Sequence, residues 1–187
     1  MAGGTMLATP GLSLLAQATL EVLDPRQAAA RLARRGHVLL MRHAQTVAGT
    51  GDPPGFRLDD CATQRNLSDQ GRAQARAIGE ALRAAAIVPV KVQSSAWCRC
   101  RETAELAFGD YTVLPALNSF FEDRSSAPAQ LEALREAGRR VPVQDTIVWV
   151  THQVVISALA GRFTSQGEIL AVPAGDADWT PAFSIRA

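Results

Sequence analysis

Short apolar runs alternate along this chain with stretches in which apolar residues recur at helical spacing. The apolar runs at residues 37–42, 90–93 and 146–151 predict buried strands, with a shorter strand near 112–114. Helical spacing predicts helices over residues 26–35, 96–108 and 129–137, and over a segment from about residue 69 that Pro89 ends. Strands alternating with helices indicate an α/β protein, for which we expect a three-layer α/β/α sandwich with a mainly parallel central sheet.

Capping residues set the limits of these helices. Asp24 caps the first helix, Pro25 lies in its first turn and Gly36 ends it. Ser68 or Asp69 caps the next one. Residues 44–66, between the first strand and that helix, hold several glycines and prolines and show no apolar period. They predict a long loop, and such loops are usually functional or disordered.

Three predicted strands end in residues that can carry chemistry. Arg42 and His43 end the first strand, Ser94 and Ser95 end the second, and His152 follows the third. In a parallel sheet, ligands bind beyond the carboxyl ends of the strands, so these residues are expected to converge on one crevice. The serines themselves are interpreted as the cap of the following helix.

Composition limits the partners that the chain can have. Its 187 residues are 47% apolar and 20% charged, which suits one globular domain, predicted over residues 25–187 after a tail of residues 1–24. A formal net charge of +1 excludes bulk attraction to nucleic acid. No segment predicts stable membrane insertion. The expected partner is a small phosphorylated molecule, and the oligomeric state is not predicted.

The N-terminal residues and the cysteines bear on the cellular compartment in which the protein works. Residues 6–18 are apolar and end in an Ala-x-Ala pattern, which resembles the later part of a secretory signal although no basic residue precedes Arg26. A periplasmic or secreted location is therefore favoured, with the cytoplasm as the alternative. The spacing of the three cysteines, Cys61, Cys98 and Cys100, does not fit a paired zinc site. Two states are expected: a disulfide from Cys61 to either Cys98 or Cys100 if the protein is exported, or three free thiols if it is cytosolic.

Four segments together resemble one known family. Leu40–Thr46 resembles the Arg-His-Gly signature of the histidine phosphatase (phosphoglycerate mutase-like) superfamily. Asn66–Ala75 is similar to its Leu-Ser-x-x-Gly helix start, Ser94–Ala104 to its Ser-Ser-x-x-x-Arg-x-x-x-Thr-Ala segment, and Val150–Gln153 to its second-histidine segment. The resemblance runs in the family's order from about residue 36 to residue 161. It implies the phosphoglycerate mutase-like fold and a phosphatase-type member.

The resemblance also implies a mechanism and a set of site residues. His43 would attack phosphorus and form a phosphohistidine that water hydrolyses. Arg42 and Arg99 would hold the phosphoryl oxygens with their planar guanidinium groups, and His152 would donate to one of them. Gln45 and Thr46, which follow the nucleophile, are expected to face the substrate. The motifs require no cofactor, and arginines beside the histidines argue against a metal site.

The proton donor is missing from its usual places. One branch of the family carries a glutamate directly after a Leu-Asn pair, where this chain has Ser119, and the other carries an aspartate after the second histidine, where it has Gln153. Glu122 and Asp123 are the nearest replacements and are predicted as candidate acids. Asp59 and Asp60, in the long loop, are further candidates, and Arg57 or Arg65 could add an anion contact.

Three functions therefore remain open. We expect a metal-independent hydrolase of a phosphomonoester that acts through phosphorylated His43. A phosphohistidine or phosphoanhydride hydrolase would use the same pocket without a strong acid. A module that binds phosphate and turns over weakly or not at all is the alternative from another class. Mutase activity is disfavoured because the family's glutamate is absent.

Overall fold

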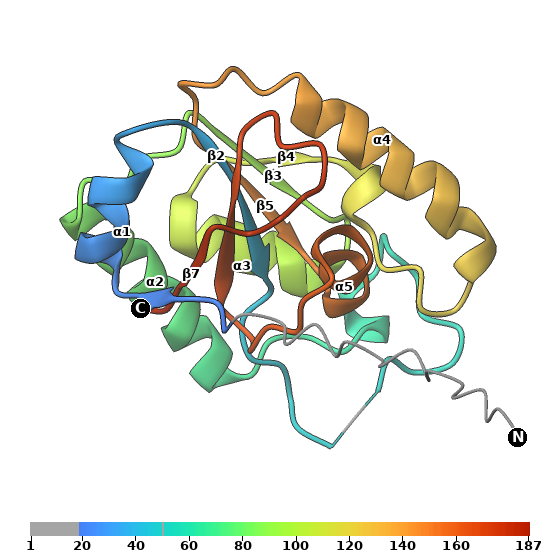
Figure 1. Cartoon of the computed structure of the whole chain (residues 1–187). Helices are drawn as coiled ribbons and strands as arrows, with labels where there is room; N and C mark the ends of the chain where they lie inside the picture. The colour runs from blue at the N-terminus through green and yellow to red at the C-terminus, as the bar shows by residue number, and fades with distance from the viewer. Residues whose placement is uncertain (1–18, 50) are drawn as a thin grey trace, which may run out of the picture.

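The predicted strands pair into one mixed sheet. In the computed structural model, which describes residues 19–49 and 51–187, seven strands lie in the order β1-β7-β6-β2-β5-β3-β4 (Figure 1). They are β1 (Val22–Leu23), β2 (His37–Arg42), β3 (Lys91–Ser94), β4 (Thr112–Val113), β5 (Ile147–Thr151), β6 (Ile169–Pro173) and β7 (Phe183–Ile185). The β2–β5, β5–β3, β3–β4 and β1–β7 pairs are parallel, while β6 runs antiparallel to both its neighbours. The α/β class and the mainly parallel sheet are confirmed.

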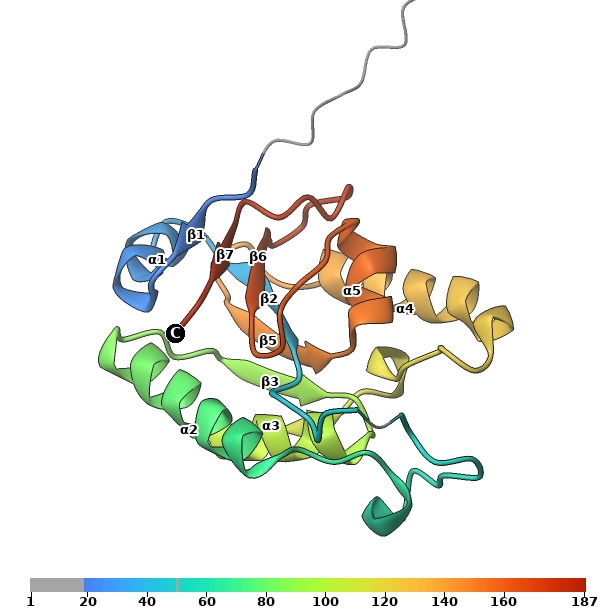
Figure 2. The same ribbon diagram turned by 90° about the horizontal axis from the view of Figure 1, so that it is seen from below.

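Helices cover both faces of this sheet. They are α1 (Pro25–Leu32), α2 (Asp69–Ala84), α3 (Cys98–Phe108), α4 (Ala127–Arg139) and α5 (Gln153–Ala160). Figure 2 shows α1, α2 and α3 on one side of the strands and α4 and α5 on the other. Short 3-10 helices at Cys61–Thr63, Pro115–Leu117 and Arg124–Ser126 lie in the connections.

The alternation of side chains along β2 creates two cores. Leu39 and Met41 face a core shared with α2 and α3, whereas Val38 and Leu40 face one shared with α4 and α5. Successive side chains of a strand point to opposite faces, so a central strand covered on both sides is apolar throughout. The first five residues of β2 are buried, and the strand ends at Arg42, which is only partly buried.

The sequence-based elements differ from the structure at the two chain ends. Strand β1 pairs with β7 at the sheet edge, so the sheet begins before residue 25. Helix α5, β6 and β7 were not predicted. The proposed signal-like segment lies outside the described residues. Among the described helices, none is both long enough and apolar enough to cross a membrane.

Candidate active site

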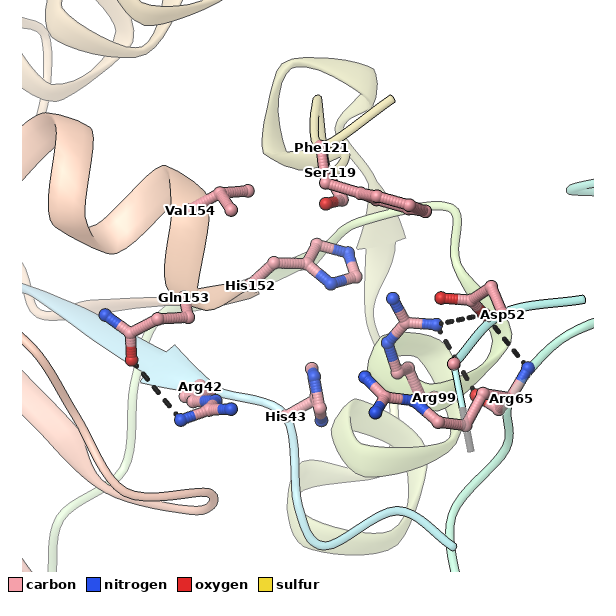
Figure 3. Close-up of a pocket in the computed structure, with 11 residues that line it drawn as sticks. Arg42, His43, Asp52, Arg65, Arg99, Ser119, Phe121, His152, Gln153 and Val154 are labelled. Carbon is pink, nitrogen blue, oxygen red and sulfur yellow. Dashed lines mark hydrogen bonds and ion pairs between the residues drawn. The ribbon is translucent and has the colours of Figure 1, made fainter. Parts of the chain in front are cut away.

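A pocket of about 260 Å³ opens at the carboxyl ends of β2 and β5. The four residues predicted as its centre all line it: Arg42, His43, Arg99 and His152 (Figure 3). These four residues lie at the ends of three elements. β2 ends at Arg42, His152 follows β5, and α3 begins one residue before Arg99. The other lining residues are Gly51, Asp52, Arg65, Ser119, Phe121, Gln153 and Val154.

His43 is held in one tautomer by its own neighbour. Its Nδ1 lies 2.8 Å from the carbonyl oxygen of Ala44, which can only accept a hydrogen bond. Nδ1 therefore carries the proton, and Nε2 keeps its lone pair. The Ala44 amide in turn donates to Thr103 Oγ1 at 3.0 Å, so α3 fixes the turn that orients the ring. This arrangement presents a neutral nucleophilic nitrogen.

The surroundings keep the His43 ring uncharged. Burial first, and then the positive charges of Arg99 and Arg42, lower the pKa of His43 to about 3. Protonation of the ring would remove the lone pair of Nε2, so a lowered pKa keeps that lone pair available at neutral and mildly acidic pH.

This state of His43 can be observed directly. In nitrogen NMR spectra of the free protein, the His43 ring is expected to stay neutral, protonated at Nδ1, as the pH falls from 7 through the usual histidine range near 6.5. Its midpoint should lie near pH 3, if the fold survives to that pH. A midpoint near 6.5, or a proton on Nε2, would contradict the geometry described here.

Arg42 is anchored on one side and open on the other. Its Nη1 donates to the carbonyl oxygen of Thr164 at 2.6 Å and to Gln153 Oε1 at 3.3 Å. Its Nε is buried and has no hydrogen-bond partner among the described residues. Gln153, at the position where one family branch has an aspartate, thus holds the arginine in place. A buried donor without a partner is costly and suits a site built for an anion.

Arg99 lies across the pocket from Arg42. Its guanidinium carbon is 4.4 Å from the centre of the Trp97 ring, and its Nη1 donates to Asp52 Oδ1 at 2.9 Å. Like that of Arg42, its buried Nε has no partner among the described residues. Arg65 lines the same wall of the pocket. Burial lowers the pKa of Arg65, and the nearby positive charge of Arg99 lowers it further.

His152 is oriented by residues behind it. Ser95 Oγ lies 2.9 Å from His152 Nε2, and Cys100 Sγ lies 3.4 Å from the same nitrogen. Burial raises the pKa of Cys100 to about 12, so its sulfur stays a thiol that can donate. With Nε2 occupied by these two groups, Nδ1 is the nitrogen left for a substrate oxygen, and one ring nitrogen of His152 points towards His43 (Figure 3).

Ser95 was interpreted only as a helix cap, and the structure gives it a second role. Its Oγ accepts from the Trp97 amide at 3.2 Å, as a cap does, and also contacts Asn118 Oδ1 and His152. The Ser-Ser pair at a strand end was the available signal, but a cap and a histidine partner look the same in sequence.

Gln45 and Thr46 do not line the pocket. The Gln45 amide donates to Gln74 Oε1, and Thr46 Oγ1 accepts from Gln166. Their segment packs against the start of α2, where a Cβ at Gly71 would collide with the Gln45 carbonyl oxygen. Gly71 therefore permits close contact between α2 and the loop that follows His43.

The two candidate acids do not line the pocket either. Glu122 and Asp123 are exposed, and neither lines it. The Asp123 carboxylate accepts from the amide and hydroxyl of Ser125, which lowers its pKa and starts a 3-10 helix. Asp59, in the long loop, is 83% exposed and pairs with Arg57. Among the described residues, the carboxylate that lines the pocket is that of Asp52.

The long loop is tied to α3 beside Arg99. Cys61 and Cys98 form a disulfide, and Cys100 is a buried thiol. The Cys98 amide also donates to Gln64 Oε1 at 2.9 Å. Of the two loop arginines considered from sequence, Arg65 reaches the pocket, while Arg57 is exposed and pairs with Asp59 and Asp60.

The charges of the pocket suit a phosphate group. Three guanidinium groups face one carboxylate, and burial lowers the pKa of both pocket histidines so that they are neutral. This leaves two net positive charges, which match a phosphomonoester dianion. No group of three His, Cys, Asp or Glu side chains in the described part of the chain is placed to hold a metal ion.

The fold and the site together define an α/β protein with a neutral histidine in a pocket lined by arginines. A model of the histidine phosphatase superfamily (branch 1) matches residues 38–120, a stretch that includes Arg42, His43 and Arg99. Over this stretch the chain is similar to the histidine phosphatase superfamily, as its signature segments predict.

Solved structures share this fold at low sequence identity. The protein histidine phosphatase SixA, solved with tungstate, is 18% identical, with a TM-score of 0.52 over 77% of this chain and 91% of that one. An open reading frame product of Mycobacterium tuberculosis is 18% identical, with a TM-score of 0.53 over 73% and 90%. An Escherichia coli K-12 protein provisionally assigned as an alpha-ribazole-5'-P phosphatase is 18% identical, with a TM-score of 0.51 over 80% and 93%. No curated protein sequence is significantly similar to the chain.

Proposed function

We propose that the protein is a phosphohydrolase that cleaves a phosphomonoester through a phosphohistidine at His43, without a metal ion. The observation that carries this proposal is the tautomer of His43, whose Nδ1 bonds to the Ala44 carbonyl inside a pocket of three arginines. The free Nε2 lone pair and the surrounding cationic donors are what phosphoryl transfer to histidine needs.

The residues divide the reaction into two displacements. His43 Nε2 attacks phosphorus, the bond from phosphorus to the leaving oxygen breaks, and that oxygen takes a proton from solvent water. Arg42, Arg99 and Arg65 stabilise the charge on the equatorial oxygens, and the ring of His152 lies beside them. A water molecule then attacks phosphorus, the bond to Nε2 breaks, and neutral His43 and inorganic phosphate result.

The leaving group would meet an apolar wall. Phe121 is 42% exposed, lines the pocket and packs against Trp97 at 5.8 Å between ring centres. Val154 lines the pocket as well. These side chains favour a leaving group with an apolar or planar face over one that presents only hydroxyl groups.

A phosphohistidine or phosphoanhydride hydrolase is the second candidate. It is favoured by the positions of Glu122 and Asp123, which are exposed and outside the pocket. Imidazole and phosphate are better leaving groups than an alkoxide and need less help from an acid. The fold similarity to the protein histidine phosphatase SixA is compatible with this candidate.

Hydrolysis of p-nitrophenyl phosphate in the presence of a chelator tests the proposed function. The wild-type protein is expected to release p-nitrophenol steadily, and tungstate, which is a phosphate-like oxyanion, is expected to inhibit it. Tungstate binding without turnover of p-nitrophenyl phosphate or of phosphohistidine would instead favour the phosphate-binding module.

The leaving group should control the rate if no side chain protonates it. We expect p-nitrophenyl phosphate to be cleaved at least about a hundredfold faster than glycerol phosphate, since a general acid is worth about that much or more. Glu122→Gln and Asp123→Asn should each change kcat less than about twofold on both substrates, because the two carboxylates are exposed. A selective loss on glycerol phosphate in either variant would identify that residue as the acid.

We also propose that the protein works in an oxidising compartment, which is the periplasm or the exterior of the cell. The Cys61–Cys98 disulfide supports this location, because such bonds persist where thiols are not kept reduced. Mass analysis of the protein purified from its source should find this bond intact. Two thiols at these positions would favour the cytoplasm.

A further inference from the structure

Asp52 is a carboxylate buried among the arginines of the pocket, and the family signature segments do not include it. The side chains of Asp52 and Arg99 are 4% and 3% exposed, and they form an ion pair. The Arg65 amide donates to the same oxygen, Oδ1, at 2.9 Å. A negative charge beside a site for anions opposes substrate binding by Coulomb's law, so its presence calls for a compensating role.

The hydrogen bonds of Arg99 indicate what that role is. Its Nη1 donates to Asp52 at 2.9 Å and lies 3.4 Å from the Arg65 carbonyl oxygen. Both partners belong to the long loop, on the side of Arg99 away from the histidines. The opposite edge of the guanidinium, which includes Nε, is turned towards His43 and His152 (Figure 3). That Nε is buried without a hydrogen-bond partner among the described residues.

We propose that Asp52 is a positioning residue that holds Arg99 by Nη1 and thereby aims its free edge at the phosphoryl group bound to His43. The proposal rests on the proposed phosphohydrolase function. Arginine has a long side chain with several rotatable bonds, and holding it in one orientation before the substrate arrives removes an entropic cost from the reaction.

Other contacts orient Arg99 less well. Trp97 supports the flat face of the guanidinium at 4.4 Å, but a stacking contact allows rotation in the plane of the ring. A hydrogen bond from Nη1 to a charged acceptor fixes that rotation. The loop that carries Asp52 is itself fixed to α3 by the Cys61–Cys98 disulfide, one residue from Arg99.

The test compares three variants on p-nitrophenyl phosphate. Asp52→Ala removes the acceptor of the hydrogen bond from Arg99 Nη1. It is expected to lower kcat/KM about a hundredfold, which is the usual loss when a catalytic group is misplaced by about 1 Å. Asp52→Asn keeps an oxygen that accepts from Nη1 and should stay within about fivefold of wild type. Asp59→Ala, in the same loop and outside the pocket, is the matched control and should leave activity unchanged.

A proton-donor role for Asp52 predicts a different pattern. A general acid would be lost in both Asp52→Asn and Asp52→Ala, and the loss would be greater for glycerol phosphate than for p-nitrophenyl phosphate. Positioning predicts equal losses on the two substrates and rescue by asparagine. Failure of asparagine to rescue, or an Asp52→Ala protein with wild-type kcat/KM, would overturn the proposal.

Tungstate binding keeps this test independent of turnover. Removing a carboxylate from a cationic pocket should strengthen oxyanion binding if only charge matters. If Asp52 positions Arg99, the dissociation constant of tungstate, measured by calorimetry, should instead rise about tenfold in Asp52→Ala and change little in Asp52→Asn. Tighter binding in folded Asp52→Ala would reject positioning, whereas absent turnover in the wild type would reject only the hydrolase function.

Discussion

His43→Ala is expected to abolish turnover of p-nitrophenyl phosphate, with kcat falling at least about ten-thousandfold, because the variant has no atom that can accept the phosphoryl group. The other pocket residues stay in place, so tungstate should still bind to the variant. Steady-state kinetics and calorimetry on the same preparation measure both effects. Loss of turnover with retained binding would separate nucleophilic attack from substrate binding.

A matched control for this variant exists in the same strand. His37 begins β2, is buried against Phe183, and bonds to the Arg35 carbonyl oxygen, far along the strand from Arg42. His37→Asn should retain activity while it remains folded. Unchanged turnover in His43→Ala, or equal loss in the two variants, would contradict nucleophilic attack by His43.

Removing the disulfide is expected to have the largest effect on stability. Cys61 and Cys98 are separated by 37 positions, and opening a loop of that length should lower the free energy of unfolding by about 3–4 kcal/mol. The double variant Cys61→Ser/Cys98→Ser, or reduction by dithiothreitol, can be followed by denaturant unfolding. The reductant should destabilise the wild type and leave the double variant unchanged.

The same change should also lower activity. The disulfide closes residues 61–98, which include Arg65, and it anchors at Cys61 the long loop that carries Asp52; both side chains line the pocket. When the loop is released, these side chains lose their fixed position beside Arg99. If reduction leaves both stability and kcat/KM unchanged, the bond does not hold the loop in the way described.

The apolar pattern was sufficient to predict the centre of the fold. The interiors of β2 and β5 are apolar because helices cover both faces, and α2 and α3 have apolar stripes with clear limits. β6 is equally buried, but it lies antiparallel between β2 and β7, and that pairing follows from contacts distant in sequence. β1 has two residues, which are too few to show any period.

The site was predictable where side chains follow regular elements. Arg42 ends a strand, and His43 and His152 each follow one. Arg99 lies in the first turn of α3, so the topology of a parallel sheet places the four together. Asp52 and Arg65 lie in a loop without period, and only the folded loop shows that both reach the pocket. Glu122 and Asp123 lie close in sequence to the usual position of the acid, but their loop turns them to solvent.

The stereochemistry of phosphoryl transfer tests the central claim most directly. A p-nitrophenyl thiophosphate whose two non-bridging oxygens are different isotopes is chiral at phosphorus. The wild-type protein can hydrolyse it in water that carries the third oxygen isotope, so that the product is chiral as well. Attack by His43 followed by attack of water gives two in-line displacements, so the account predicts net retention of configuration. Net inversion would show that water attacks the substrate directly, and would contradict a phosphohistidine intermediate.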